Sequence, residues 1–297
     1  MTKLRTGKID ISPYLFILPS LLIMVAFLIF PIARALQLSL TDTRLLEISK
    51  AKFNGFDNYR AFFSDSSFGR VVLATLSYVV AGVSLTYILG LFTASIVNKP
   101  FWGKGFVRTI LILPWVVPSV VLVIIWKWML SSRYGVINFF LHEIGLIPID
   151  FSWLSNPRFA MCAIILATIW KQYPLGLLIL LAGMQSIPKE LYEAASVDGA
   201  TAFQKFFLIT IPGLRYVTTV LILLLTIWHF GNFVIIWLMT RGGPSDITAT
   251  FTIFTYLTTF KFHKLGMGAS IGTVIFIISL LFTVIYYILF VRKLVRV

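Results

Sequence analysis

Long apolar runs separated by short polar segments dominate the chain. Each run that can cross a bilayer as a helix needs about 20 residues. Six runs meet that length, at residues 13–33, 71–97, 106–126, 159–184, 216–240 and 270–291. They are continuous rather than alternating, which is the pattern of membrane helices and not of barrel strands. The sequence therefore predicts an all-α integral membrane protein, with six transmembrane helices in one domain covering residues 1–297.

The composition supports a membrane protein and argues against a soluble one. Hydrophobic residues make up 59% of the chain and charged residues only 12%, whereas a soluble domain carries about 25% charged residues. A net charge of +14 on a soluble protein would suggest nucleic acid binding. Here the basic residues stand singly between apolar runs, so they indicate topology signals and contacts with lipid headgroups. We expect membrane lipid as a partner and no nucleic acid.

The distribution of lysine and arginine predicts the orientation. Cytoplasmic segments of membrane proteins are enriched in these residues. With the N-terminus placed inside, the inner segments of this chain have a higher density of lysine and arginine than the outer segments. The inner segments then hold Lys3, Arg5, Lys8, Lys99, Lys104, Arg108, Lys189, Lys205, Arg215, Arg292, Lys293 and Arg296. Both termini are therefore predicted to be cytoplasmic.

The inner segment at residues 185–213 differs from the other loops. Pro188 stands at a first-turn position, and the acids that follow it suit the positive end of a helix dipole. Gly199 supplies a backbone position that can take positive φ, so the chain can turn there. A second helix is expected from Ala200 to Leu208, ending before Pro212. The pattern predicts a short helix–turn–helix with small exposed residues, which allows close docking of another protein.

The same segment carries a resemblance to a known family. Glu193-Ala194-Ala195, followed by Gly199, Ile209 and Pro212, resembles the EAA loop of permeases in binding-protein-dependent ABC importers. One departure is Ile211, where the family usually has leucine, a mild apolar exchange. Segments 53–59, 113–118, 170–174, 232–234 and 242–244 are similar to the carbohydrate-uptake branch, in particular to maltose-type "F" permeases.

This resemblance implies the type I ABC importer permease fold and a division of labour among subunits. The chain itself is expected not to be an enzyme, and it lacks the Gly-rich phosphate loop of an ATPase. The implied partners are a second homologous permease, two cytosolic ATPase subunits that bind ATP and Mg, and an extracytoplasmic solute-binding protein. No cofactor bound by this chain is expected. The implied location is the cell or inner membrane of a bacterium or archaeon.

In the family the EAA loop is a coupling helix that contacts the ATPase, whose closure drives alternating access. The residues expected to form this contact are Glu193, Ala194, Ala195, Asp198, Gly199, Ile209 and Pro212. Glu193 is expected to make a charged contact with the ATPase, while Ala194, Ala195 and Gly199 allow close approach.

Two spans carry candidate substrate contacts. Lys171 is a charge inside an apolar run, and such residues usually face a bundle interior or an aqueous cavity. Trp228 and Asn232 are four residues apart and would share one helix face. An aromatic surface beside hydrogen-bonding groups suits a sugar, and matching segments of the maltose-type permease contribute to its sugar site. The expected substrate contacts are Lys171, Gln172, Leu175, Trp228, His229 and Asn232. Leu175 replaces an aromatic residue and His229 an amide of that relative, so the sugar itself stays open.

Structural roles for these residues remain alternatives. Trp228 can serve packing alone, Asn232 can bond a neighbouring helix, and Lys171 can bond a carbonyl or a water chain. An ion-gradient-driven secondary transporter of a small polar solute is the alternative function. Such proteins often have acidic residues at mid-membrane, and no Asp or Glu occurs in the six runs. No nucleophile, acid pair or metal cluster is evident, so no catalytic and no metal-binding residue is predicted.

Overall fold

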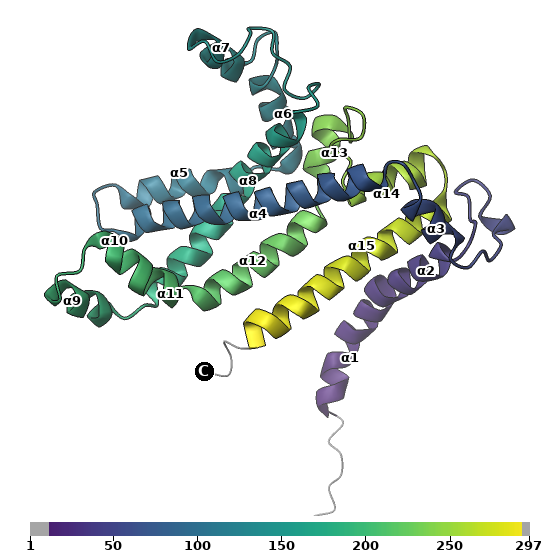
Figure 1. Cartoon of the computed structure of the whole chain (residues 1–297). Helices are drawn as coiled ribbons and strands as arrows, with labels where there is room; N and C mark the ends of the chain where they lie inside the picture. The colour runs from purple at the N-terminus through teal and green to yellow at the C-terminus, as the bar shows by residue number, and fades with distance from the viewer. Residues whose placement is uncertain (1–11, 293–297) are drawn as a thin grey trace, which may run out of the picture.

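A computed structural model describes residues 12–292, and helices form all of its regular secondary structure (Figure 1). Within those residues the chain forms no β-strand, only an isolated bridge between Thr41 and Phe53. The prediction of an all-α membrane fold is confirmed. Lys3, Arg5, Lys8, Lys293 and Arg296, on which the predicted orientation partly rests, lie outside the described residues.

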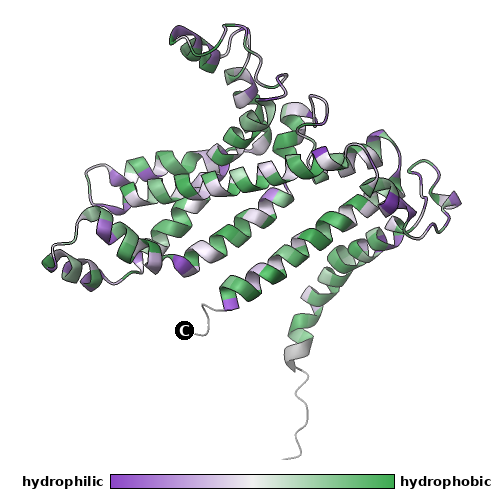
Figure 2. Cartoon of the chain, viewed as in Figure 1, coloured by the Kyte–Doolittle hydropathy of each residue, from purple (hydrophilic) through white to green (hydrophobic). Residues whose placement is uncertain are grey.

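Four helices are long and apolar enough to cross a membrane, and two bent helix pairs raise the number to as many as six: Lys104–Val116 with Ser119–Met129, bent by 98°, and Ala202–Gly213 with Arg215–Phe230, bent by 66°. The continuous ones are Leu15–Ser39, Phe68–Asn98, Ala160–Gln185 and Leu265–Val291. The first comprises α1 (Ser12–Met24), a π-helical turn (Val25–Ile29) and α2 (Phe30–Ser39); the others are α4 (Phe68–Asn98), α8 (Ala160–Gln185), and α15 (Leu265–Tyr286) with a π-helical turn (Tyr287–Val291). Hydrophobic residues dominate these helices along their length (Figure 2).

The third apolar run, predicted as one helix, is broken in the middle. It forms α5 (Lys104–Val116) and α6 (Ser119–Met129), which meet at an angle of 98°. The cause is Pro118, which has no N–H to donate and disfavours helical backbone at the residue before it. Val117 and Pro118 accordingly take extended backbone, with ψ of 126° and 140°. Alone, α5 rises only about 20 Å, less than the hydrocarbon core.

The fifth run is also interrupted, where the sequence predicted one helix over residues 216–240. In the structure α12 (Arg215–Phe230) ends before Gly231, and α13 (Val234–Thr240) begins after a short break. The break is held by polar bonds: the Asn232 backbone N–H donates to the His229 carbonyl at 3.2 Å, and the Thr252 hydroxyl donates to the Asn232 backbone carbonyl at 2.9 Å. A threonine hydroxyl of this kind offers the backbone a hydrogen-bond partner outside the helix.

The central core forms where α4 and α8 lie against each other, with α12 crossing both. The helices approach closely through glycine: a β-carbon built on Gly90 of α4 would lie 3.0 Å from the Gly176 carbonyl carbon of α8. Small residues commonly allow such close contact between membrane helices. A second layer pairs α2 with α15 beside this core (Figure 1).

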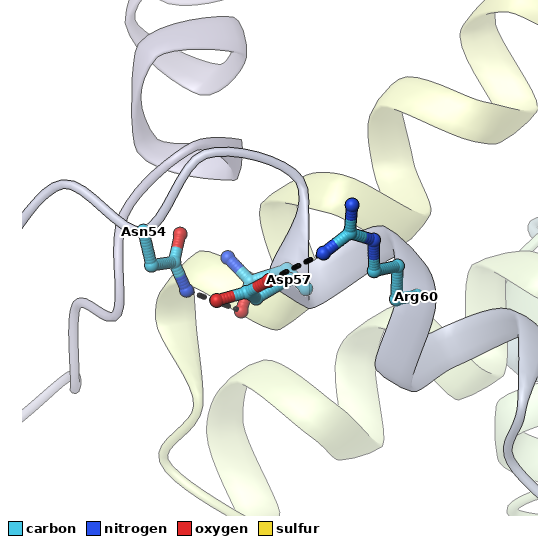
Figure 3. Close-up of polar contacts among 4 residues, drawn as sticks. Asn54, Asp57 and Arg60 are labelled. Carbon is cyan, nitrogen blue, oxygen red and sulfur yellow. Dashed lines mark hydrogen bonds and ion pairs between the residues drawn. The ribbon is translucent and has the colours of Figure 1, made fainter.

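Short helices lie in the connecting segments at the end of the bundle opposite α9 (Lys189–Val197), α10 (Ala202–Lys205) and α11 (Ile211–Gly213) (Figure 1). They are η2 (Ile48–Lys50), α3 (Asp57–Phe63), α7 (Val136–Glu143), α14 (Phe251–Tyr256) and η4 (Leu257–Lys261). Asn58 fixes the first of these segments, because its amide donates to the carbonyls of Ser39 (2.9 Å) and Thr41 (2.8 Å) at the end of α2. The neighbouring contacts are an Asn54–Asn58 hydrogen bond of 3.3 Å and an Asp57–Arg60 ion pair of 3.4 Å. Figure 3 labels Asn54, Asp57 and Arg60 in this segment.

Candidate functional site: the α9–α11 loop and the helix crossing

The inner segment of the sequence folds as two short helices. Pro188 precedes α9 (Lys189–Val197), and Glu190 lies in its first turn as the sequence suggested. Gly199 has a φ of +77°, and the helix end closes through two bonds, from Ala200 N–H to the Ala195 carbonyl (2.8 Å) and from Gly199 N–H to the Ser196 carbonyl (3.2 Å). This is the Schellman pattern, which glycine makes easily because it has no β-carbon.

The second helical segment runs further than predicted. Thr201 and Gln204 form a capping box at the start of α10 (Ala202–Lys205), which continues through a π-helical turn (Phe206–Thr210) into α11 (Ile211–Gly213). The prediction that this helix ends before Pro212 is wrong. The wider turn, in which the Ile211 N–H bonds the Phe206 carbonyl, allows a proline to follow without ending the helix.

Two side-chain bonds hold the two segments together. The Tyr192 hydroxyl lies 3.0 Å from that of Thr210, and the Lys205 ammonium donates to the Ser196 hydroxyl at 2.6 Å. Glu193, Ala194, Asp198 and Gly199 are exposed, and Ala195 is half-buried. Ile209 packs against the central core, whereas Pro212 is exposed beyond it. The predicted coupling residues thus divide into an exposed group on α9 and its turn, and Ile209, which anchors the loop.

Among the candidate substrate residues, Lys171 caps the break between α5 and α6. Its ammonium lies 2.6 Å from the Val117 carbonyl and 3.4 Å from the Trp115 carbonyl. Pro118 and the bend leave backbone carbonyls here without helical partners. The lysine charge therefore has a structural use inside the apolar span, as one of the alternatives anticipated.

His229 is almost fully buried, at 1% exposed. Its Nδ1 lies 2.8 Å from the Leu225 carbonyl, and because a carbonyl can only accept, Nδ1 carries the hydrogen. The ring packs on Tyr78, with centroids 5.4 Å apart, and on Gly82. Nε2 is then an acceptor without a partner in residues 12–292.

A chain of hydrogen bonds next to this histidine joins α4, α8 and the break between α12 and α13. The Asn232 amide donates to the Tyr78 hydroxyl at 2.7 Å, and that hydroxyl lies 3.1 Å from the Thr168 hydroxyl. Tyr78 and Thr168 were not predicted from the sequence. The signal that could have identified them is a hydroxyl side chain inside an otherwise apolar run. Asn232 thus bonds a neighbouring helix, which was its alternative role.

The remaining candidates differ in how freely a solute could reach them. Trp228 is 43% exposed, and Leu175 and Gln172 are half-buried. The Gln172 carbonyl oxygen is buried and has no hydrogen-bond partner in the described part of the chain. The hydrogen bonds therefore place Lys171 at the α5–α6 break and Asn232 beside the α4–α8–α12 crossing, next to His229. Trp228 is accessible to other contacts, whereas the unpartnered side-chain oxygen of Gln172 is buried.

Comparison with known proteins identifies the family. Residues 86–295 match the profile of the binding-protein-dependent transport system inner membrane component. The chain belongs to this family. It is thus a multi-pass permease of ABC transporters in the inner membrane, and the expected fold and location are confirmed.

The permease is similar to named sugar transporters along nearly all its length. It is 36% identical to the trehalose/maltose transport system permease protein MalF of Thermococcus litoralis over 96% of this chain and 94% of that protein. It is 34% identical to the sulfoquinovosyl glycerol transport system permease protein SmoG of Agrobacterium fabrum, over 92% and 88%. The fold matches a bacterial ABC transporter that imports the acidic polysaccharide alginate, with a TM-score of 0.80 over 95% and 96% at 22% identity.

Proposed function

We propose that this permease forms the transmembrane path of an ATP-driven importer for a sugar or oligosaccharide. The single observation that carries the proposal is the α9 turn. It presents Glu193, Ala194, Asp198 and Gly199 outward on a segment closed by a Schellman motif and two side-chain bonds. A rigid and exposed protrusion suits transmission of force from another subunit, because a mobile loop would absorb the movement.

The partners follow from the family. A second homologous permease completes the pathway, and two cytosolic ATPase subunits bind ATP and Mg, so this chain binds no cofactor and hydrolyses nothing itself. An extracytoplasmic solute-binding protein delivers the substrate; a solved relative of this fold is in complex with an alginate pentasaccharide-bound periplasmic protein. The α9 turn and both termini then face the cytoplasm, in keeping with the density of Lys and Arg in the inner segments.

The substrate class is supported by the relatives and by the exposed aromatic residue of α12. Trehalose/maltose and sulfoquinovosyl glycerol are named for two relatives, and Trp228 offers an accessible ring of the kind that stacks on sugars. Gln172 has an unpartnered side-chain oxygen that is buried in this structure and becomes available to a sugar when the pathway opens, with Leu175 one turn away. Lys171, His229 and Asn232 support this surface from within the bundle and gain sugar contacts when the pathway opens.

Two variants at the α9 turn test the coupling role. The variants are Gly199→Asp and Gly199→Asn. Asn and Asp tolerate positive φ better than other side chains and about equally, so the two variants differ mainly in charge. We expect Gly199→Asp to abolish substrate-stimulated ATP hydrolysis in the reconstituted transporter while the chain still inserts and assembles. Full coupling in both variants, or ion-gradient-driven uptake by the chain alone, would contradict the proposal.

Labelling tests the orientation independently of activity. The single native cysteine, Cys162, is exposed, so a Cys162→Ser background is required. A cysteine at Ala195 should react with a membrane-impermeant maleimide only in inverted vesicles. Reaction in intact cells would place the loop outside the cytoplasm and exclude ATPase coupling through it.

A further inference from the structure

A cavity of about 550 Å³ opens where the end of α4 meets α10. In Figure 1 this region lies at the end of the bundle that carries α9 and α11. Its walls come from the last turns of α4, the end of α8, Tyr192 of α9, and the α10 segment with its π-helical turn. The lining residues used below are Phe92, Ser95, Ile96, Lys99, Lys205 and Phe206.

The cavity is divided chemically into an apolar part and a cationic rim. Phe92 and Ile96 present exposed apolar surface, at 62% and 45%, and Phe206 adds an aromatic wall. Lys99 and Lys205 supply two positive charges, and no carboxylate lines the cavity. The Lys205 ammonium also donates one hydrogen bond to the Ser196 hydroxyl, which leaves two of its three N–H groups for an anion. Neither lysine belongs to a salt bridge within residues 12–292. An occupant that complements both parts has an anionic head and a hydrocarbon tail.

The residues around the rim are of the types that proteins place at the depth of the lipid headgroups. The turn that joins α4 to α5 contains Trp102, which is 99% exposed, between Lys99 and Lys104. Exposed tryptophan beside lysine is typical of the membrane–water interface, where the ring lies among headgroups and the lysine reaches them. On α10, Phe203 is 72% exposed and suits contact with the acyl boundary of the same leaflet.

From these observations we infer that the cavity binds one anionic phospholipid, such as phosphatidylglycerol. Its phosphodiester lies between the ammonium groups of Lys99 and Lys205, and one acyl chain runs along Phe92 and Ile96. Tyr192 connects this cavity to the α9 turn, so, on the proposed function, the bound lipid touches the segment that couples to the ATPase. The lipid site itself depends only on the cavity and its rim.

Lipid binding can be measured directly on the full-length chain. The protein is purified from membranes containing phosphatidylcholine and phosphatidylglycerol, and retained lipid is identified by native mass spectrometry. We expect one tightly held phosphatidylglycerol in the wild type. Lys99→Gln/Lys205→Gln should weaken its retention roughly tenfold or more, since each lysine near an anionic lipid contributes several-fold to affinity, while Lys99→Arg/Lys205→Arg should retain it.

Controls separate this site from general charge effects and from free anions. Lys50→Gln/Lys52→Gln removes two exposed lysines from the distant Thr41–Phe53 segment and should leave retention unchanged. Ser95→Phe fills the apolar part without altering the rim and should also expel the lipid; melting curves verify that each variant is folded. Equal retention by the wild type and the Gln variant overturns the inference. Displacement by inorganic phosphate at the same concentration as lipid overturns it too, because the apolar part would then contribute nothing.

Discussion

His229 of α12 lies directly against Gly82 of α4. A β-carbon built on Gly82 would be 2.5 Å from both Nε2 and Cδ2 of the imidazole, closer than any ordinary van der Waals contact. The His229 ring cannot easily move away, because its Nδ1–H donates to the Leu225 carbonyl and the ring packs on Tyr78. The crossing of α4 and α12 thus depends on the absence of a side chain at one position.

The first prediction follows from this contact. Gly82→Ala should destabilise the permease by about 1–3 kcal/mol, the usual cost of overpacking a well-filled core, measured as a lower melting temperature in detergent. Gly69→Ala on the same helix is the matched control, since a β-carbon there meets nothing within 4 Å. His229→Ser should partly restore the melting temperature of the Gly82→Ala variant. A Gly82→Ala variant with the melting temperature of the wild type would contradict the prediction, because α4 and α12 could then move apart without loss of stability.

Lys171 gives a second prediction, which distinguishes a cap from a sugar ligand. Lys171→Met removes the charged donor from the carbonyls of Val117 and Trp115, and bonds of this kind contribute about 1.5–3 kcal/mol. The melting temperature should therefore fall, whereas Lys127→Met, at an exposed site on α6, should have little effect. An unchanged melting temperature with a raised KM for transport would instead identify Lys171 as a direct substrate contact.

The sequence predicted the long helices well because twenty apolar residues in a row leave few alternatives in a membrane. It also predicted the turn at Gly199, because the positive φ of that residue depends only on the residue itself and its chain neighbours. The breaks at Pro118 and Gly231 were missed, since hydropathy continues across them and only backbone hydrogen bonding changes. At Pro212 the sequence predicted the end of a helix that in fact continues, because a π-helical turn precedes the proline.

The partners of polar residues inside the spans were beyond sequence reasoning. Nothing in the order of residues connects Lys171 with a carbonyl more than 50 positions earlier, or Asn232 with Tyr78. The Asn232 contact depends on how α4, α8 and α12 cross, and the Lys171 contact depends on how α8 packs against the break between α5 and α6. The candidate substrate residues were chosen by type and by resemblance, and their roles remain predictions until transport is measured.

A third prediction concerns the segment in Figure 3, where two polar residues close together should differ in importance. Asn58 donates to two backbone carbonyls at the end of α2, so Asn58→Ala should cost about 1–3 kcal/mol by leaving acceptors unsatisfied. Arg60 pairs with Asp57 at 3.4 Å, but the two side chains are 81% and 67% exposed. Arg60→Ala should therefore cost at most about 1 kcal/mol. Melting temperatures of the two variants give the comparison, and equal losses would contradict it.

The last prediction separates the accessible Trp228 of α12 from the buried Tyr78 of α4. Trp228→Ala removes an exposed ring and should raise the KM for a transported sugar roughly tenfold, on the order of one lost aromatic contact, with little change in melting temperature. Tyr78→Phe removes the hydroxyl that links Asn232 to Thr168 and should act in the opposite way, lowering the melting temperature first. Transport assays and melting curves on the same preparations decide between them. A Trp228→Ala variant with normal transport would move the sugar path away from α12, while leaving coupling through α9 open to its own test.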